Sequence, residues 1–425
     1  MERSERSVLL VASGGHALCH VATLVLQQVV VEAARDLGIP SIGWVVALGP
    51  FLMGFCALPA GLLGDRFGTR RIYRGYLALL ALASGAAAFA PGAWLFVPAA
   101  ALIGVAAAFH HPVGLAWIGE ALPAQRARAL GIHGFVGHFG STLAPTLVLL
   151  LAQSVGWRHT YRVVALAAAL LLALLLVTRT TRGERDFAAR HAGERRGAVP
   201  WRLVLAPALL LVMAAMVGNG LVHQGFWATW SSCVRAQAGV LPDPPAGSAT
   251  TLLPLLERIG ALLPDGWSAA RGGTARFAAL AGPIATFVLA FGSLGELFGA
   301  RLAKRGSGLR RYAAMNALSA LGLLGVAWLP GAGLLLAGAL FAFCHFGTQP
   351  LENELIARRV DPRVRGLAYG MKFVVSFGIG SLATDPAIAG WRDHGFPPVF
   401  VALAGVALGG VVVSLFAARR HSALR

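Results

Sequence analysis

Residues 61–71 read GLLGDRFGTRR, and this short segment decides the fold class. It gathers one carboxylate and three arginines, namely Asp65, Arg66, Arg70 and Arg71. The segment follows an apolar run that includes Pro59, in a chain of 425 residues of which 57% are hydrophobic. Such a group of charges is typical of the point where a helix leaves a membrane and the chain turns back.

The composition indicates that lipid surrounds most of the chain. Only 13% of the residues are charged, whereas soluble domains carry roughly 25%, and the mean hydropathy is +0.69. The charges lie between apolar runs of roughly 20 residues, which as helices cross a bilayer of ~30 Å. We therefore predict an all-α integral membrane protein with twelve transmembrane helices. The spans are expected at about residues 8–31, 41–63, 73–90, 94–118, 129–152, 160–178, 203–230, 276–298, 312–329, 332–356, 366–389 and 397–416.

The distribution of the basic residues predicts the orientation in the membrane. A net charge of +18 would suggest a nucleic-acid partner for a soluble protein, but these clusters are too short to form a continuous basic face. Most of the 36 lysines and arginines lie instead in the segments on the side of the N-terminus. By the positive-inside rule, the N- and C-termini are expected to be cytoplasmic. We expect the membrane to be the cell's inner (plasma) membrane. No nucleic-acid partner is expected.

Three sequence matches at a shared offset of about 238 residues predict two pseudo-symmetric six-helix halves. RARALG at residue 126 resembles RVRGLA at residue 363, and GDRFGTRR at Gly64 resembles AKRGSGLRR at Ala303. Pro112 and Pro350 each follow a histidine near the middle of a span. We expect one half over residues 1–178, a cytoplasmic linker over 179–202, and a second half over 203–425 that includes a long outer loop at about 231–275.

The loop at residues 61–71 resembles the signature of the major facilitator superfamily, which has the form G-x-L-x-D-R-x-G-R-[RK] between helices two and three. Thr69 departs from it at the first closing arginine, and Lys304 replaces the aspartate in the second copy. The resemblance implies the fold of that superfamily and transport by alternating access. It also implies a latch in the conformational cycle, formed by Gly61, Asp65, Arg66, Gly68, Arg70 and Arg71.

A finer resemblance comes from FHHPVG at residues 109–114 and ALGIHGFVGHFGSTLAP at residues 129–145. These two stretches are most similar to drug exporters of the fosmidomycin-resistance type, which implies export. Val113 stands where a carboxylate is expected after the proline, and the fourth span lacks the arginine that is common in drug/proton antiporters.

Histidines are the unusual polar residues of the predicted spans. Because polar groups in lipid are costly, they are expected to face a cavity or to hydrogen-bond a neighbouring helix. Imidazole titrates near neutral pH, so His110, His111 and His138 are candidates for proton coupling, with Glu296 as an acidic candidate. The pair His16 and His20 offers two metal ligands, but the sequence specifies no third. We predict no metal site and no cofactor.

Lys372 is a cation seven residues past Arg365, inside a predicted span. It is predicted either to snorkel to the interface or, because carboxylates such as Glu352 are placed near the cytoplasmic helix ends, to bind an anionic substrate. The predicted substrate cavity consists of His16, His20, Gln27, His133, His223, His345 and Lys372.

The most consistent function is that of a secondary active transporter, not an enzyme. It is predicted to be a monomer that exports a small polar or anionic drug or metabolite across the bilayer in a proton-coupled cycle. Proton-coupled uptake of a small organic anion is the first alternative, because sequence fixes orientation and not the direction of flux. An intramembrane enzyme, for which the sequence has no HExxH motif, and a non-transporting sensor are alternatives of a different class.

Overall fold

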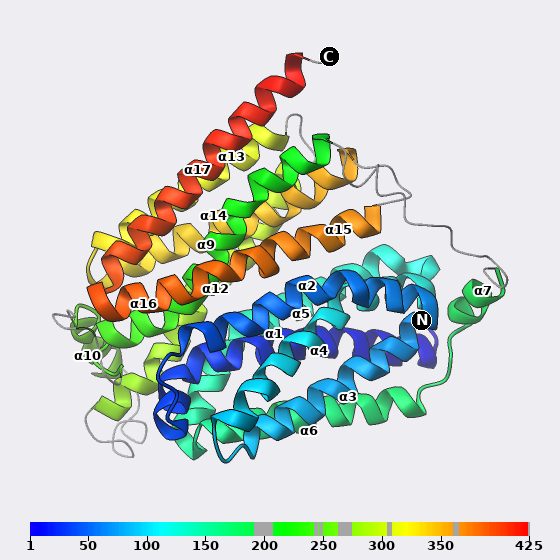
Figure 1. Ribbon diagram of the computed structural model, residues 1–425, viewed down its shortest axis with the longest axis horizontal. Coiled ribbons are helices and arrows are strands. Elements are labelled where there is room, and N and C mark those ends of the chain that lie inside the picture. The colour runs from blue at the N-terminus through cyan, green and yellow to red at the C-terminus, as the bar shows by residue number, and fades with distance from the viewer. Residues whose placement is uncertain are drawn as a thin grey trace.

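The computed structural model describes residues 1–190, 207–241, 250–261, 274–303, 308–359 and 365–423, together with residue 245. Over these residues the regular structure is entirely helical, and a helix lies at each of the twelve predicted spans (Figure 1). Nine of the described helices are long and apolar enough to cross a membrane. The prediction of an all-α membrane protein is confirmed, and the helices are consistent with twelve spans.

The first bundle consists of six long helices in which successive members are joined by short turns (Figure 1). Gly68, with a φ of 89°, and Gly156, with a φ of 94°, allow two of these turns. The helices are α1 (Arg3–Leu37), α2 (Gly43–Phe67), α3 (Thr69–Ala88), α4 (Ala93–Ala121), α5 (Arg126–Val155) and α6 (Trp157–Val177). A short η1 (Pro123–Gln125) precedes α5.

The second bundle contains five long helices and one segment of mixed helix type. The long helices are α9 (Pro207–Gln237), α12 (Thr274–Ala303), α13 (Gly308–Trp328), α14 (Gly331–Arg359) and α17 (Phe396–Ala423). The eleventh predicted span is divided into α15 (Arg365–Phe373), the π-helical η3 (Val374–Ile379), the 3₁₀-helical η4 (Gly380–Ala383) and α16 (Thr384–His394). The predicted span is therefore helical throughout but of mixed helix type.

Two predicted connections are described only in part. In the linker predicted at 179–202, α7 (Arg182–Arg190) is helical, and residues 191–202 lie outside the described residues. In the outer loop predicted at 231–275, α9 continues to Gln237 and α10 spans Leu253–Ala261. Residues 242–244, 246–249 and 262–273 of that loop also lie outside the description.

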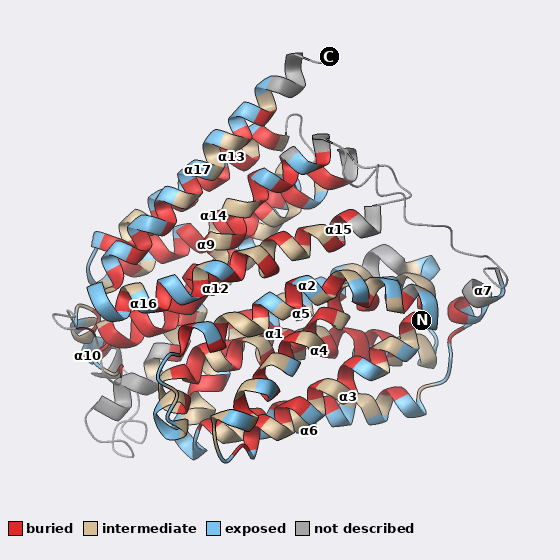
Figure 2. Cartoon of the chain, viewed as in Figure 1, coloured by how far each residue is buried: buried red, intermediate tan, exposed pale blue. Residues whose placement is uncertain are grey.

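Large apolar side chains cover the outside of the molecule, and the buried residues lie inside the two bundles (Figure 2). Leu82, Val177 and Leu336 are each more than 70% exposed. Outward apolar surface of this extent is expected where the solvent is hydrocarbon. The chain is thus a multi-pass membrane protein.

The two bundles approach each other at the end remote from the chain termini and diverge towards the termini (Figure 1). At the remote end, Arg235 of α9 pairs with Glu32 of α1. Thr146 of α5 and Thr286 of α12 share a hydrogen bond of 2.7 Å between their hydroxyl oxygens. These polar contacts connect α1 with α9 and α5 with α12.

Helix α2 crosses the eleventh span at a close contact between Gly54 of α2 and Gly378 of η3. A Cβ on Gly54 would overlap the backbone of Gly378 and the carbonyl oxygen of Phe373. Small residues allow this close backbone approach, which is a usual means of packing helices in membranes. Any side chain at Gly54 would therefore force α2 and η3 apart.

Candidate functional site

Helices α1, α4 and α5 bring five histidines together inside the first bundle. His16 lies at the centre, with its ring centroid 4.3 Å from that of His133 and 4.9 Å from that of His110. The other two rings lie at 4.9 Å for His20 and 5.2 Å for His111. We call His16, His20, His110, His111 and His133 the histidine cluster.

Local sequence explains why these rings meet. His16 and His20 are four residues apart, so they project from one face of α1. Opposite them, α5 presents Gly137 and Gly140. A Cβ on Gly137 would overlap the ring of His16, and one on Gly140 would overlap the backbone of Ala17. Because these two glycines have no side chains, α5 can approach α1 closely and still leave space for the ring of His16.

The histidine cluster is only partly satisfied by hydrogen bonds. His16 Nδ1 lies 2.9 Å from the carbonyl oxygen of His133, and His20 Nε2 lies 3.2 Å from His16 Nε2. Nε2 of His110, Nε2 of His111 and both ring nitrogens of His133 are buried without a partner in the described part of the chain. Buried polar atoms of this kind are costly, so the cluster can accept a ligand, a proton or water.

Each bundle contains a buried tyrosine, Tyr73 in the first and Tyr312 in the second. The two positions differ by about the same number of residues as the sequence matches between the halves. Tyr73 lies with its hydroxyl oxygen 3.1 Å from His110 Nδ1 and 3.2 Å from the carbonyl oxygen of Ala12. Tyr312 donates towards Glu352 at 3.0 Å and towards the carbonyl of Ala215 at 3.4 Å. Each tyrosine thus joins the first and fourth long helices of its bundle. The repeat in the sequence contains both positions and gives a signal that would have identified them.

In the second bundle, Glu352 of α14 is the centre of a buried network. One oxygen accepts hydrogen bonds from Asn219 Nδ2 at 2.7 Å and from Tyr312. The other lies 2.9 Å from Lys372 Nζ, which also donates to Asn353 Oδ1 at 2.8 Å. The sequence analysis placed Glu352 near a cytoplasmic helix end and did not pair it with Lys372, whereas the structure pairs the two buried side chains.

His223 of α9 and His345 of α14 form a pair of histidines in the second bundle. His223 Nδ1 lies 3.1 Å from His345 Nε2, and the two rings stack with centroids 5.3 Å apart. Phe346 and Phe377 each place a ring centroid 5.8 Å from that of His223. This pair is therefore enclosed by aromatic rings.

Contacts between the bundles also involve predicted site residues. His138 Nδ1 of α5 lies 3.4 Å from Glu296 Oε1 of α12. The ring of His111 stacks on that of Phe373 with centroids 5.0 Å apart. Gln27 is buried in α1, and its side-chain oxygen has no partner among the described residues. His138 is thus separate from the histidine cluster in its hydrogen bonding but is paired across the bundles.

The latch residues whose side chains the structure describes lie in different surroundings. Gly61 and Gly64 pack on Pro112 and Val113 of α4. Arg66, Gly68 and Arg71 are exposed. The side chain of Asp65 lies outside the described residues, as do residues 304–307 of the second copy.

Arg70, a predicted latch residue, has well-defined partners among the described residues. It lies 3.2 Å from both carboxylate oxygens of Glu184 and also donates to the carbonyls of Leu175 and Thr178 at the end of α6. Glu184 also accepts from Trp117 Nε1 at 2.8 Å and from the Thr181 amide at 2.6 Å. Sequence analysis missed Glu184, although Thr181 and Glu184 form a recognisable capping box at the start of α7.

Among curated proteins, the chain is similar to transporters and resistance proteins. It is 30% identical over 180 residues to the multidrug resistance protein Stp of Mycobacterium tuberculosis (strain CDC 1551 / Oshkosh), covering 41% of this chain and 34% of Stp. It is 36% identical over 145 residues to the puromycin resistance protein pur8 of Streptomyces alboniger, covering 33% and 28% of the two chains. It is 27% identical over 127 residues to the niacin transporter NiaP of Acinetobacter baylyi, covering 30% and 29%. The matches span about a third of the length of these relatives.

Solved transporter structures share the fold over nearly the whole chain. A bacterial homologue of the human lysosomal transporter Spinster, in an inward-facing and occupied conformation, gives a TM-score of 0.71 at 13% identity and covers 99% of this chain and 98% of that chain. A partially occluded inward-open xylose transporter, XylE from E. coli, gives 0.64 at 14% identity, with coverage of 97% and 98%. A sequence profile described as Major Facilitator Superfamily matches residues 14–383. This chain therefore belongs to the Major Facilitator Superfamily and has the fold of membrane transporters.

Proposed function

We propose that this transporter couples the movement of protons to the export of a small polar or anionic compound by alternating access. The observation that carries this proposal is the contact between His138 and Glu296 across the two bundles. The remaining elements of the proposal are the cytoplasmic termini, the plasma membrane and the monomeric state. They rest on the charge distribution and the repeat described above.

The contact between His138 and Glu296 joins the two bundles through groups that can bind a proton. Its strength can therefore affect how the bundles are positioned relative to each other. A protonated imidazole attracts a carboxylate, and a neutral imidazole loses most of that attraction. The side chain of His138 is 13% exposed and that of Glu296 is 34% exposed, so protons can reach the pair. Loss or gain of a proton would therefore change the strength with which α5 holds α12.

The interior supports a polar substrate. The histidine cluster and the His223–His345 pair offer imidazole nitrogens as hydrogen-bond donors and acceptors. An anionic group would reach Lys372 only in competition with Glu352, which already pairs with it. Anion binding at Lys372 is therefore proposed as an exchange of one carboxylate partner for another.

Export is the proposed direction because several similar proteins are named for resistance to toxic compounds. Within that class, the stretches at residues 109–114 and 129–145 support the fosmidomycin-resistance type as the subtype. Uptake is the second candidate, and the similarity to a protein named a niacin transporter favours it. The two directions are distinguished by measuring flux.

The test is substrate flux in proteoliposomes with an imposed pH gradient and a panel of compounds that includes phosphonates. We expect wild-type protein to move a compound against its gradient when protons move the other way. His138→Gln and Glu296→Gln should abolish this pH-driven flux but preserve exchange of substrate for substrate. His159→Gln serves as the control, because His159 lies near the start of α6, where its ring contacts Arg162 and not Glu296.

Three results would contradict the proposal. Compound binding without flux would indicate a sensor. Proton-driven accumulation in the opposite direction would indicate uptake. Unchanged pH dependence in both the His138 and the Glu296 variants would remove this pair from the coupling step.

A further inference from the structure

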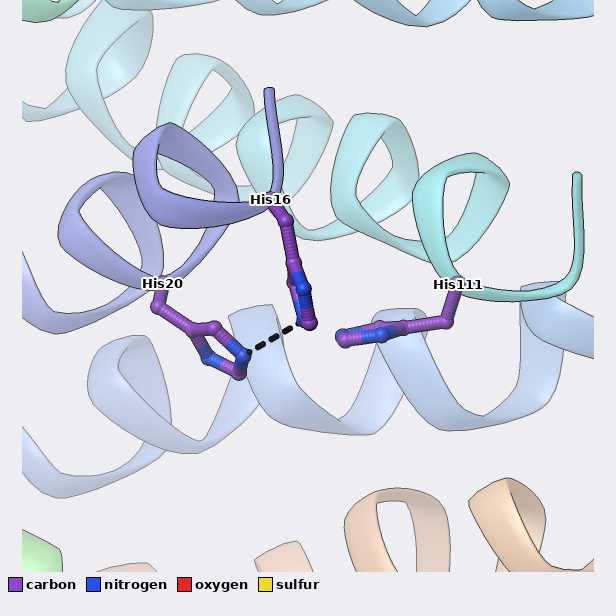
Figure 3. Close-up of side chains that lie close together, drawn as sticks. All are labelled: His16, His20 and His111. Carbon is purple, nitrogen blue, oxygen red and sulfur yellow. Dashed lines mark hydrogen bonds between the residues drawn. The ribbon is translucent and has the colours of Figure 1, made fainter. Parts of the chain in front are cut away.

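We propose that His16, His20 and His111 form a binding site for a first-row transition-metal ion, for which Zn²⁺ is the probe. One ring nitrogen from each of the three residues lies within 4.8 Å of the others. Figure 3 shows the three rings pointing towards one another from α1 and α4. The third ligand that the sequence did not specify is therefore His111, which is distant in sequence and close in space.

The distance between the first two ligands matches metal coordination. Zn²⁺ binds imidazole nitrogen at about 2.0–2.1 Å in tetrahedral sites, which places neighbouring ligand nitrogens ~3.3 Å apart. The Nε2 atoms of His16 and His20 are 3.2 Å apart. Both residues can therefore bind one ion with little movement of α1, whose four-residue spacing sets this geometry.

The hydrogen bond of His16 fixes the protonation that metal binding needs. Its Nδ1 faces the carbonyl oxygen of His133 at 2.9 Å, and a carbonyl oxygen only accepts, so Nδ1 carries the proton. In the neutral ring, Nε2 then presents a lone pair towards His20. A metal-bound histidine usually donates its other N–H to a carbonyl or carboxylate in this way. His20 would have to carry its proton on Nδ1 when the ion is bound.

His111 supplies a nitrogen that is free within the described residues. Its Nε2 is buried without a hydrogen-bond partner, and its ring is held by stacking on Phe373 at 5.0 Å. Binding an ion would satisfy this atom, whose burial is otherwise costly. With three histidines bound, the fourth tetrahedral position is left for water or an anion.

A second set of three ligands, His16, His110 and His133, also has its nitrogens within 4.8 Å. Two observations favour the first set. His110 Nδ1 already faces the Tyr73 hydroxyl at 3.1 Å, and His110 and His133 are at most 1% exposed. His16 and His20 are only partly buried, so they are less enclosed than His110 and His133.

The ligand types select the kind of ion. Three neutral imidazoles suit Zn²⁺, Ni²⁺ or Cu²⁺, whereas Mg²⁺ and Ca²⁺ prefer oxygen ligands. The inference goes beyond the proposed proton coupling, which rests on His138 and Glu296 and not on these three ligands. It is tested by binding alone, so it can succeed or fail independently of any transport result.

The experiment uses the full-length protein, purified with a tag that lacks histidine, in detergent micelles. Titration calorimetry should detect a Zn²⁺ site, and Co²⁺ should give the visible absorption of a tetrahedral complex that Zn²⁺ then displaces. His16→Gln, His20→Gln and His111→Phe should each weaken Zn²⁺ binding at least tenfold. Phenylalanine keeps the stacking of residue 111 on Phe373. His159→Gln is the control and should leave binding unchanged, because the described contact of His159 is with Arg162 near the start of α6.

Size-exclusion profiles and melting temperatures without metal establish that each variant is folded. The rise in melting temperature on adding Zn²⁺ gives a second measure of binding for any variant that expresses poorly. Full binding by His20→Gln or by His111→Phe would overturn the proposal. Loss of binding only in His110→Gln and His133→Gln would overturn it in favour of the second set.

Discussion

Lys372 places its ammonium nitrogen 2.9 Å from Oε2 of Glu352, and both side chains are at most 10% exposed. The other oxygen of Glu352 is held by Asn219 and Tyr312. Because every charge in this group has a partner, the ion pair can persist in a low-dielectric interior. The pair links α14 to α15 and makes two charged residues mutually dependent.

The first prediction concerns the stability of this pair. Lys372→Gln leaves a buried carboxylate without its cation, and Glu352→Gln leaves a buried cation without its carboxylate. Each substitution should lower the free energy of unfolding by about 3–5 kcal/mol, the usual cost of removing one partner of a buried ion pair. The double variant should lose less than the sum of the two. Unfolding curves in detergent measure this coupling, and strictly additive losses would show that the two residues are independent.

The second prediction concerns substrate charge. If an anionic compound exchanges with Glu352 at Lys372, then Glu352→Gln removes its competitor. We expect this variant to bind an anionic compound about tenfold more tightly, or ~1.4 kcal/mol, and to bind a neutral analogue unchanged. Lys372→Gln should weaken the anionic compound alone. Equal affinities for the charged compound in wild type and both variants would remove Lys372 from the site.

The third prediction concerns α7. Glu184 is buried and accepts hydrogen bonds from Arg70, Trp117 and the Thr181 amide. Glu184→Gln removes the charge on which the strongest of these depends and should release α7 from the first bundle. Trypsin should then cleave at Arg182 or Arg185 several times faster than in wild type.

Asp186→Asn is the control for this experiment. Asp186 lies on the same helix and pairs with Arg182, but the two side chains are 58% and 82% exposed. Exposed ion pairs contribute little, so cleavage should not accelerate. Equal acceleration in both variants would mean that Glu184 does not hold α7 in place.

The fourth prediction concerns the crossing of α2 and η3. Gly54→Ala should destabilise the protein and slow transport, because the added methyl group would overlap the backbone of Gly378. Gly49→Ala is the matched control on the same helix, where a Cβ would meet no atom within 4 Å. Melting temperatures and flux in proteoliposomes measure the difference. A normal flux in Gly54→Ala would show that the close approach is not needed for the cycle.

The spans could be predicted because the length of an apolar run is a local property of the chain. The π-helical stretch of the eleventh span could not, because an apolar run has the same appearance whether its backbone is α- or π-helical. The pairing of Glu352 with Lys372 could not be predicted, because the position of a residue near the end of an apolar run does not show whether its side chain faces the interior of the bundle.

The histidines were recognisable as unusual, but their partners were not. Neither the contact of His16 with His133 nor the pairing of His138 with Glu296 has a signature in sequence spacing, since each joins helices that are far apart in the chain. The resemblance to a known loop identified residues 61–71, yet the partner of Arg70 lies in a segment interpreted only as a charged linker.

Gly54 divides α2 into two arms of similar length. Eleven residues separate it from the start of the helix at Gly43 and thirteen from the end at Phe67, which correspond to about 16 and 20 Å. A rigid helix that rotates about a point near its centre moves both of its ends by similar distances. A rotation of about 20° at this point would displace each end of α2 by roughly 6 Å, in opposite directions. The position of one glycine would thereby keep the opening on one face of the membrane in proportion to the closing on the other.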